Sequence, residues 1–269
     1  MKNIRVDTLK HIKINDMTEV WNRCWQGYYY HMLYKPKHMR GWLDLSQVSL
    51  QHSMAIFVED QIAGFALLSI EGTDGWIAGA CIDPNYRRKG LFRALMRIEL
   101  DVARRIGLKR VYLEVLEQNY AHKAYQSVGF RRLRQLNIYR IKNWIECPNL
   151  VMRPLESVTI ERYFDNRRAL FKPAWQRREG YLRRHGNILA VMNSSGSAGA
   201  LFVGDKNALV LDAWSSTAAG AAEVISTISL RTGASWSLTN QPEDQIAAFL
   251  KTRGIKTSAI QDEMLIEMT

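Results

Sequence analysis

A basic, glycine-containing loop is the first segment of this chain that could carry chemistry. The residues Asn85-Tyr86-Arg87-Arg88-Lys89-Gly90 separate an apolar stretch ending at Ile82 from a helical pattern beginning at Leu91. A helix N-terminus attracts phosphate because its first N–H groups are unpaired and carry a partial positive charge. Three consecutive cations raise the local potential, and Gly90 lets the backbone approach a ligand closely. The pattern favours a pyrophosphate site, although a solvated basic loop would give the same residues.

A second segment that could carry chemistry begins at Tyr112, after the helical pattern that follows this loop. A short apolar strand at Tyr112–Leu116 is followed by Glu117-Gln118-Asn119 and by a short helix that contains Tyr125. The pair Gly129-Phe130 then ends that helix. A tyrosine on such a helix can act as a proton donor, or it can be an ordinary core aromatic residue.

Together the two segments resemble a known family. The stretch RRKGLFRALM resembles motif A of the GNAT N-acetyltransferase superfamily, and LEVLEQNYAHKAYQSVGF resembles its motif B. The resemblance covers about residues 1–145 and is most specific over 83–130. It implies an α+β, GNAT-like fold whose mixed, mostly antiparallel central sheet is flanked by helices. It also implies an acetyltransferase that uses acetyl-CoA as cosubstrate and transfers acetyl to an amine by direct attack in a ternary complex.

The resemblance assigns roles to individual residues. Tyr125 would protonate the departing thiolate or hold the thioether sulfur. The strand before the loop would bind the pantetheine arm through its backbone, and the motif A loop would bind the pyrophosphate. The cofactor-binding positions implied in this way are Cys81, Ile82, Arg87, Arg88, Lys89, Gly90, Leu91, Phe92, Arg93 and Asn119.

Two positions depart from the family pattern. Motif A ends in a small residue, where this chain has Phe92, so the phenyl ring must turn into the core or the loop must shift. Asn119 and Tyr125 are six residues apart, where the family has seven. This shorter spacing weakens the assignment of Asn119 more than that of Tyr125.

The base that accepts the proton of the attacking amine is harder to locate. Glu114 lies in the middle of a strand, where some family members place their base, and a carboxylate there is unusual unless it faces the cleft. Glu114 could equally be an outward-facing strand residue without a catalytic role. Asp74 and Glu71, in the loop before the cofactor strand, are weaker candidates.

An aromatic stretch near the N-terminus falls where the family builds its acceptor site. Its rings could bind an aromatic or cationic substrate, or they could pack in the core, which we favour for Trp25 and Tyr29. The stretch contains Trp25, Tyr28, Tyr29, Tyr30 and Tyr34.

The elements that would position these residues follow an order of β-α-α-β-β-β-α-β-α-β. The periodicity and turn residues predict the following segments. They are a strand at Ile4–Leu9, a helix capped by Asp16 that runs through Trp25, a helix from Pro36 to about Val48, strands at Met54–Val58, Phe65–Ile70 and Trp76–Ile82, a helix at Leu91–Ile106, a strand at Val111–Leu116, a helix at Ala121–Val128 and a strand at Arg134–Ile141.

The second half of the chain repeats this pattern with little identity. Three strand candidates between residues 188 and 211, a helix at Ala218–Leu230, a strand at Trp236–Leu238 and a helix at Asp244–Thr252 echo the first half. We therefore expect a catalytic domain at 1–145, a linker at Glu146–Asn149 and a degenerate GNAT-like domain at 150–269. The second copy has AWSSTAAGA in place of the basic loop and Leu250 in place of the tyrosine.

Composition and charge set the remaining expectations. The net charge is +11, of which residues 1–150 carry +9 (23 Lys+Arg against 14 Asp+Glu), so an anionic cofactor or a nucleic acid would suit the first half. A nucleic-acid-binding protein is one alternative that this charge suggests, although the sequence has no signature of a nucleic-acid-binding module. A coenzyme A-binding regulatory module without turnover is another alternative.

Three cysteines without CxxC spacing, no signal peptide and no long apolar run indicate a cytoplasmic protein without a membrane span, and scattered histidines indicate no metal. The expected partner is a small-molecule or peptide amine acceptor.

Overall fold

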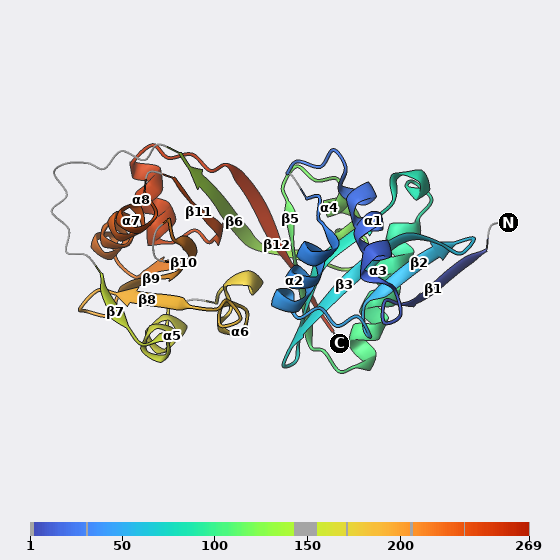
Figure 1. Cartoon of the computed structure of the whole chain (residues 1–269), viewed down its shortest axis with the longest axis horizontal. Coiled ribbons are helices and arrows are strands. Elements are labelled where there is room, and N and C mark those ends of the chain that lie inside the picture. Colours follow the sequence, from blue (N-terminus) through green and yellow to red (C-terminus); the bar gives the residue numbers. More distant parts are fainter. Residues whose placement is uncertain are drawn as a thin grey trace. The chain divides into compact units, whose positions relative to one another are not determined.

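The computed structural model divides the chain into two compact units (Figure 1). It describes residues 3–30, 32–142, 155–170, 172–204, 207–233 and 235–268. Unit 1 contains Met1–Leu133 and Met264–Thr269, and unit 2 contains Arg134–Glu263. This division differs from the expected boundaries of 1–145 and 150–269, since the C-terminal residues belong to unit 1. The expected linker and Cys147 lie outside the described residues.

The first ten elements of the chain have the predicted order, and all of them except most of the tenth lie in unit 1. They are β1 (Ile4–Thr8), α1 (Ile14–Trp25), α2 (Pro36–Ser46), β2 (Met54–Val58), β3 (Gln61–Glu71), β4 (Asp74–Ile82), α3 (Leu91–Arg105), β5 (Arg110–Leu116), α4 (Ala121–Gln126) and β6 (Arg131–Ile141). The predicted cap of the first helix is wrong. That helix begins at Ile14, and Asp16 lies inside its first turn, where its charge still favours the positive helix end.

The sheet of unit 1 is mixed and mostly antiparallel, which confirms the predicted fold class. Its strands follow the order β1-β2-β3-β4-β5, and β12 (Ala259–Glu267) and β6 come next. The pairs β1–β2, β2–β3 and β3–β4 are antiparallel, whereas β4 and β5 are parallel. The parallel pair is possible because α3 provides the long crossover between them.

Helices cover both faces of this sheet because its strands alternate two sets of apolar side chains. On one face α1 and α2 pack through Trp21 and Met39 against Phe65. On the other face α3 and α4 pack through Leu95 and Tyr125, and this core includes Met264 and Ile266 of β12. The part of β12 that begins at Met264 therefore belongs to unit 1, because its apolar side chains complete that core.

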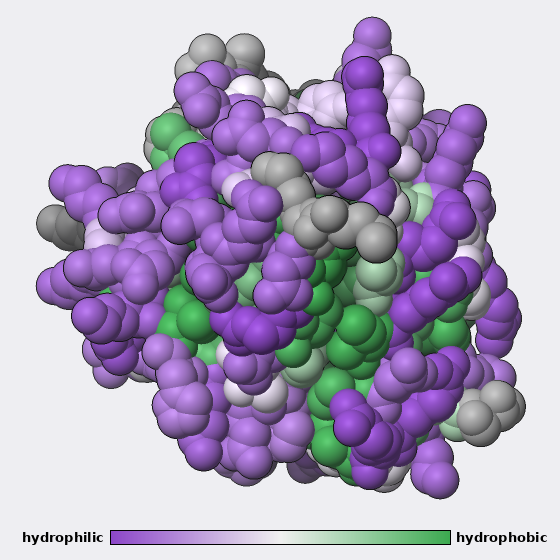
Figure 2. Space-filling view, turned by 90° about the vertical axis from the view of Figure 1, so that its right-hand side faces the viewer, coloured by the Kyte–Doolittle hydropathy of each residue, from purple (hydrophilic) through white to green (hydrophobic). Residues whose placement is uncertain are grey.

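One face of unit 1 is seen in Figure 2, and most of its surface is hydrophilic around a smaller hydrophobic area. The edge strand β1 exposes Ile4, which is 54% accessible. Arg5 and Asp7 form an exposed ion pair on the same strand at 3.0 Å. Charges on an edge strand discourage pairing with another chain.

Unit 2 repeats the pattern of strands and helices with some additions. Its elements after β6 are β7 (Glu156–Val158), α5 (Ile160–Arg168), α6 (Glu179–Leu182), β8 (Ile188–Met192), β9 (Ala198–Val203), β10 (Leu209–Ser215), α7 (Ala218–Thr232), β11 (Trp236–Gln241), α8 (Gln245–Thr252) and β12. Strands β10-β9-β8-β7 form a sheet of four, and β11 pairs with β6. The sequence predictions omitted β7, α5, α6 and β12. Across the described residues we find no helix that is both long and apolar enough to cross a membrane.

Candidate active site

The two parallel strands of unit 1 separate part-way along their length. They pair at three positions, from Asp74 opposite Arg110 to Trp76 opposite Tyr112. The register between β3 and β4 then shifts, with Leu68 opposite Ile77 and Leu67 opposite Gly79, which leaves Ala78 as a bulge. Bulges bend the strand that carries them. The bend begins where the pairing with β5 stops, so the carboxyl halves of β4 and β5 do not pair with each other, and we call this unpaired stretch the slot.

The strand β4 is least covered beside this slot. Residues 78–80 are half-buried, whereas the residues before and after them in β4 are buried. Cys81 and Ile82 remain paired on their other side with Phe65 and Gly64 of β3. The slot-facing edge of β4 thus has backbone groups that β5 does not use.

The helix α3 begins at the end of β4 without a protein cap. Gly90 is its N-cap with a φ of +75°, and no side chain bonds to the first turn. Arg88 also has a positive φ, +61°, so two left-handed residues shape the loop. A Cβ added at Gly90 would meet nothing within 4 Å. Among the described residues, none accepts a hydrogen bond from the backbone N–H groups of residues 88–93, which therefore suit an anion.

The cations of this loop have different tasks. Arg87 is structural, because its guanidinium donates to the carbonyl oxygens of Ile82 (3.0 Å) and Cys24 (2.8 Å). Lys89 is exposed and reaches Asn85 O at 3.3 Å. Arg88 is exposed and makes no bond among the described residues.

The three remaining motif A positions lie in the first turn of α3. Phe92 turns its ring towards the core and meets the ring of Tyr125 edge-on, at 5.3 Å between centroids. This arrangement accommodates the bulky residue that departs from the family pattern. Arg93 donates to Ser127 Oγ at 3.1 Å, and Leu91 is buried under the helix start.

Tyr125 lies on α4 with 7% of its surface accessible. Its ring also packs edge-on against Phe130 at 5.8 Å. Burial raises the pKa of Tyr125 above its usual value, and repulsion from Tyr28 and Cys81 raises it further. The phenol is therefore neutral at physiological pH, and its hydroxyl finds no hydrogen-bond partner among the described residues. Such a group can donate a proton to a ligand.

Asn119 connects this helix to the aromatic stretch after α1. Its Oδ1 accepts from the N–H of Ala121 at 2.9 Å, and its Nδ2 donates to the hydroxyl of Tyr28 at 3.1 Å. Burial raises the pKa of Tyr28, partly offset by the hydrogen bond from Asn119. The sequence analysis placed Tyr28 only within an aromatic stretch and did not associate it with Asn119 or Tyr125.

Glu114 is half-buried on β5, and its Oε2 accepts from the indole N–H of Trp76 at 2.6 Å. The two side chains lie on the same face of the sheet, since Trp76 is opposite Tyr112 and Glu114 follows two residues later. Trp76 is a partner that the sequence analysis missed. The weaker base candidates lie elsewhere, because Asp74 pairs with Arg110 at 2.8 Å at the closed end of the two strands, and Glu71 lies opposite Asp74.

The aromatic residues of α1 and α2 form a packed stack. Trp21 stacks on Trp25 at 3.8 Å and on Tyr34 at 5.5 Å. Tyr29 is 49% accessible and donates to the carbonyl of Gln118 at 3.1 Å. The packing role favoured for Trp25 agrees with this arrangement, whereas Tyr29 stays largely in solvent.

Comparisons with known proteins agree with this geometry. Residues 8–130 match the model of the acetyltransferase (GNAT) family. These residues form a GNAT acetyltransferase domain. Solved structures of GCN5-related N-acetyltransferases from Sphaerobacter thermophilus and Anabaena variabilis share the fold, with TM-scores of 0.65 and 0.66 at 13% and 12% identity. The alignments cover 98% and 99% of this chain, and 96% and 73% of those chains.

Curated relatives match a shorter part of the chain. A [ribosomal protein bS18]-alanine N-acetyltransferase from Escherichia coli is 34% identical over 71 residues, which are 26% of this chain and 48% of the relative. Its counterpart from Salmonella typhimurium is 29% identical over 79 residues, which are 29% of this chain and 53% of the relative. The chain thus spans about half the length of the curated relatives it matches.

The corresponding region of unit 2 differs from the GNAT domain at each of these points. The helix α7 has a side-chain cap, because Thr217 Oγ1 accepts from the N–H of Gly220 at 3.0 Å. Leu250 is fully buried on α8, where the GNAT domain has Tyr125 on α4.

A buried arginine connects the two strands of unit 2 that correspond in order to β4 and β5. The guanidinium of Arg177 donates to the carbonyls of Ala213 on β10 (2.6 Å) and Asn240 on β11 (3.1 Å), and to Gln241 Oε1 (2.9 Å). Its remaining N–H groups bind Asp212, at 2.7 and 2.6 Å. Arg177 is 2% accessible. In unit 2 the side chain of Arg177 therefore occupies the space between β10 and β11.

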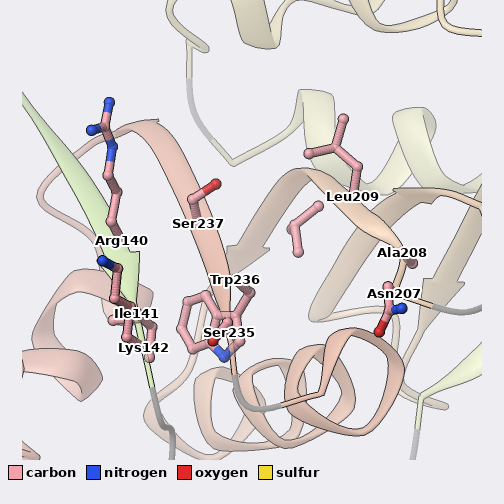
Figure 3. A pocket seen from close by; sticks show the side chains of 10 residues that line it. Arg140, Ile141, Lys142, Asn207, Ala208, Leu209, Ser235, Trp236 and Ser237 are labelled. Carbon is pink, nitrogen blue, oxygen red and sulfur yellow. The ribbon is translucent and has the colours of Figure 1, made fainter. Parts of the chain in front are cut away.

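A cavity of about 520 Å³ opens elsewhere in unit 2, beside the first residues of β10 and β11 (Figure 3). Its lining includes Trp236, Ser235, Asn207 and Lys142. In Figure 3 the side chain of Arg140 extends away from the indole of Trp236. The lining thus lacks a convergent set of catalytic groups. The described residues contain no group of three or more His, Cys, Asp or Glu side chains that could hold a metal.

Proposed function

We propose that this chain catalyses the transfer of an acetyl group from acetyl-CoA to an amine, by direct attack in a ternary complex. The slot between β4 and β5 carries the proposal, because it begins at a bulge and ends beside two groups suited to the cosubstrate. One is the uncapped start of α3, and the other is the neutral phenol of Tyr125. Unit 1 is then the catalytic domain and unit 2 a degenerate copy.

Each part of acetyl-CoA would have a suitable partner among the residues along the slot. Backbone N–H groups of residues 88–93 would hold the pyrophosphate, with Arg88 and Lys89 adding charge. The free edge of β4 around Cys81 and Ile82 would bind the amide groups of the pantetheine arm. Asn119 would act through Tyr28, since both ends of its amide already have protein partners.

The chemistry requires one proton to leave the amine and one to reach the sulfur. The amine nitrogen attacks the thioester carbonyl, a C–N bond forms and the C–S bond breaks. Glu114 would accept the amine proton, directly or through a water, with Trp76 holding its carboxylate in place. Tyr125 would protonate the thiolate as it leaves, which avoids a bare charge in an apolar pocket.

The acceptor is an amine on a small molecule or a peptide. The curated relatives act on an alanine of ribosomal protein bS18, which makes a peptide N-terminus one acceptor class to test. We place the protein in the cytoplasm, where Cys24 and Cys81 would stay reduced. Release of coenzyme A across a panel of amines and peptides tests the activity. Binding without release would favour a regulatory coenzyme A-binding module.

Gly90→Val should weaken coenzyme A binding about tenfold or more, which is about 1.4 kcal/mol. The φ of +75° is strained for valine, and the added side chain would occupy the open space in front of the unpaired N–H groups. Titration calorimetry with coenzyme A measures the change.

Gly107→Val is the matched control for this prediction. Gly107 follows the same helix at its other end, has a φ of +82° and also has nothing within 4 Å of an added Cβ. It carries the same backbone strain without facing the slot. Equal weakening by both variants, or none in a folded Gly90→Val variant, would contradict the assignment of the loop.

Titration of the whole chain with coenzyme A should give a stoichiometry of one. The start of α7 has its own cap at Thr217, and Arg177 occupies the space between β10 and β11. Unit 2 thus has a side-chain cap at the start of this helix and an arginine between the two strands, where unit 1 has an uncapped helix and unpaired strands. A stoichiometry of two would show that the second copy also binds the cosubstrate.

A further inference from the structure

Two hydrogen bonds join the segment after α1 to the turn after β5 in unit 1. Tyr29 donates to the carbonyl of Gln118, and Asn119 donates to the hydroxyl of Tyr28, each at 3.1 Å. The first bond ends on a backbone atom and can only hold the two segments together. The second ends on a hydroxyl that also has a proton to donate.

The direction of the bond between Asn119 and Tyr28 follows from the other end of the amide. Asn119 Oδ1 accepts from the backbone N–H of Ala121, which can only donate, so this oxygen is correctly placed. The amide nitrogen therefore faces Tyr28, and the phenol oxygen is the acceptor. Its own proton must point elsewhere, and no described residue accepts it.

The hydroxyl of Tyr28 lies near that of Tyr125. Asn119, which is hydrogen-bonded to Tyr28, also accepts from the N–H of Ala121 at the start of α4, so the hydroxyl of Tyr28 lies beside the first turn of the helix that carries Tyr125. The repulsion from Tyr28 that raises the pKa of Tyr125 agrees with this placement. No hydrogen bond joins the two phenols in the part of the chain that the structure describes. The other group with this influence on Tyr125 is Cys81, whose free thiol is only a weak hydrogen-bond donor.

We propose that Tyr28 donates a hydrogen bond to the thioester carbonyl oxygen of bound acetyl-CoA, while Tyr125 serves the sulfur. This inference rests on the proposed acetyl transfer. A thioester has two atoms that need a donor during the reaction, and the carbonyl oxygen gains negative charge first, as the amine attacks. A hydrogen-bond donor that is already oriented towards that oxygen stabilises the charge. Asn119 orients the Tyr28 hydroxyl by donating a hydrogen bond to the phenol oxygen.

Tyr28→Phe tests the proposal, with Tyr29→Phe as its control. Both variants remove one hydroxyl and one of the two bonds between the same segments. Loss of an oxyanion donor typically lowers kcat by about 10²–10³-fold. We expect a fall of that size for Tyr28→Phe, a much smaller one for Tyr29→Phe, and an unchanged affinity for coenzyme A in both.

Infrared difference spectra of bound acetyl-CoA, labelled isotopically at the carbonyl, give a readout that needs no acceptor. The thioester carbonyl stretch should lie at lower frequency in the wild type and in Tyr29→Phe than in Tyr28→Phe. An unshifted stretch in Tyr28→Phe, or an equal fall in kcat for both variants, would overturn the proposal. If the wild type binds acetyl-CoA but transfers no acetyl group to any acceptor, the proposed function fails, and the infrared comparison still decides the contact of Tyr28.

Discussion

Tyr125→Phe should lower kcat by about 10²–10⁴-fold while the affinity for acetyl-CoA stays nearly unchanged. The phenol is 7% accessible, and burial raises its pKa, so it is a neutral donor throughout the physiological pH range. Phenylalanine keeps the edge-on contacts with Phe92 and Phe130. It removes only the proton that the leaving thiolate needs. Steady-state kinetics with an acceptor, or slow hydrolysis of acetyl-CoA, measure the loss.

Tyr120→Phe gives the comparison for this variant. Tyr120 is the N-cap residue of the same helix and is 89% accessible. Its kcat should match that of the wild type. If Tyr125→Phe also reacts at the wild-type rate, then Tyr125 is a packing residue and the proton comes from another group.

The sequence was most informative where the site is continuous along the chain. The loop before α3, the order of elements and the position of Tyr125 could all be predicted, because a strand, a basic loop and a helix start lie next to one another in sequence. The partners of the site could not. Asn119 meets Tyr28 across 91 residues and Trp76 meets Glu114 across 38. These contacts depend on sheet register and on the path of the chain after α1.

The C-terminal strand shows a second limit. The stretch AIQDEMLIE has apolar residues at its end, but no local signal states which core they enter. Met264 and Ile266 pack in unit 1, far in sequence from the strands beside them. The prediction placed the domain boundary at the segment that contains Pro148. It therefore did not include the C-terminal residues that belong to unit 1.

In the basic stretch PAWQRREGYLRR, neighbouring arginines lie in two different environments. Arg178 is half-buried, with its guanidinium 4.3 Å from the ring centroid of Trp175, whereas Arg177 beside it is 2% accessible. Arg167 is also buried, at 4%. Sequence alone could not separate these arginines, because a buried cation is recognised by its partner, and the partner is Asp212 on a strand that comes later in the chain.

Asp212 is the centre of a fully buried network in unit 2. Its carboxylate forms ion pairs with Arg167 at 2.7 Å and Arg177 at 2.6 Å, and it accepts from the hydroxyl of Tyr163 at 2.8 Å. Asp244 is a further carboxylate near Arg177, and the arginine lowers its pKa against the effect of burial. Two guanidinium groups can be buried here because every charge has an opposite partner and hydrogen bonds.

Asp212→Asn should destabilise unit 2 by about 3–5 kcal/mol, because it leaves two buried guanidinium groups with most of their compensation removed. The amide is nearly isosteric, so the loss comes from charge and not from a cavity. Asp165→Asn is the control, since its ion pair with Arg168 is exposed on both sides, and it should change little. Because the two units can unfold separately, hydrogen exchange resolved by peptide is the appropriate measurement. Protection of β10 and β11 should fall in Asp212→Asn and stay in Asp165→Asn. Unchanged protection in both would mean that the hydrogen bonds to backbone carbonyls, and not the carboxylate, hold Arg177 between the strands.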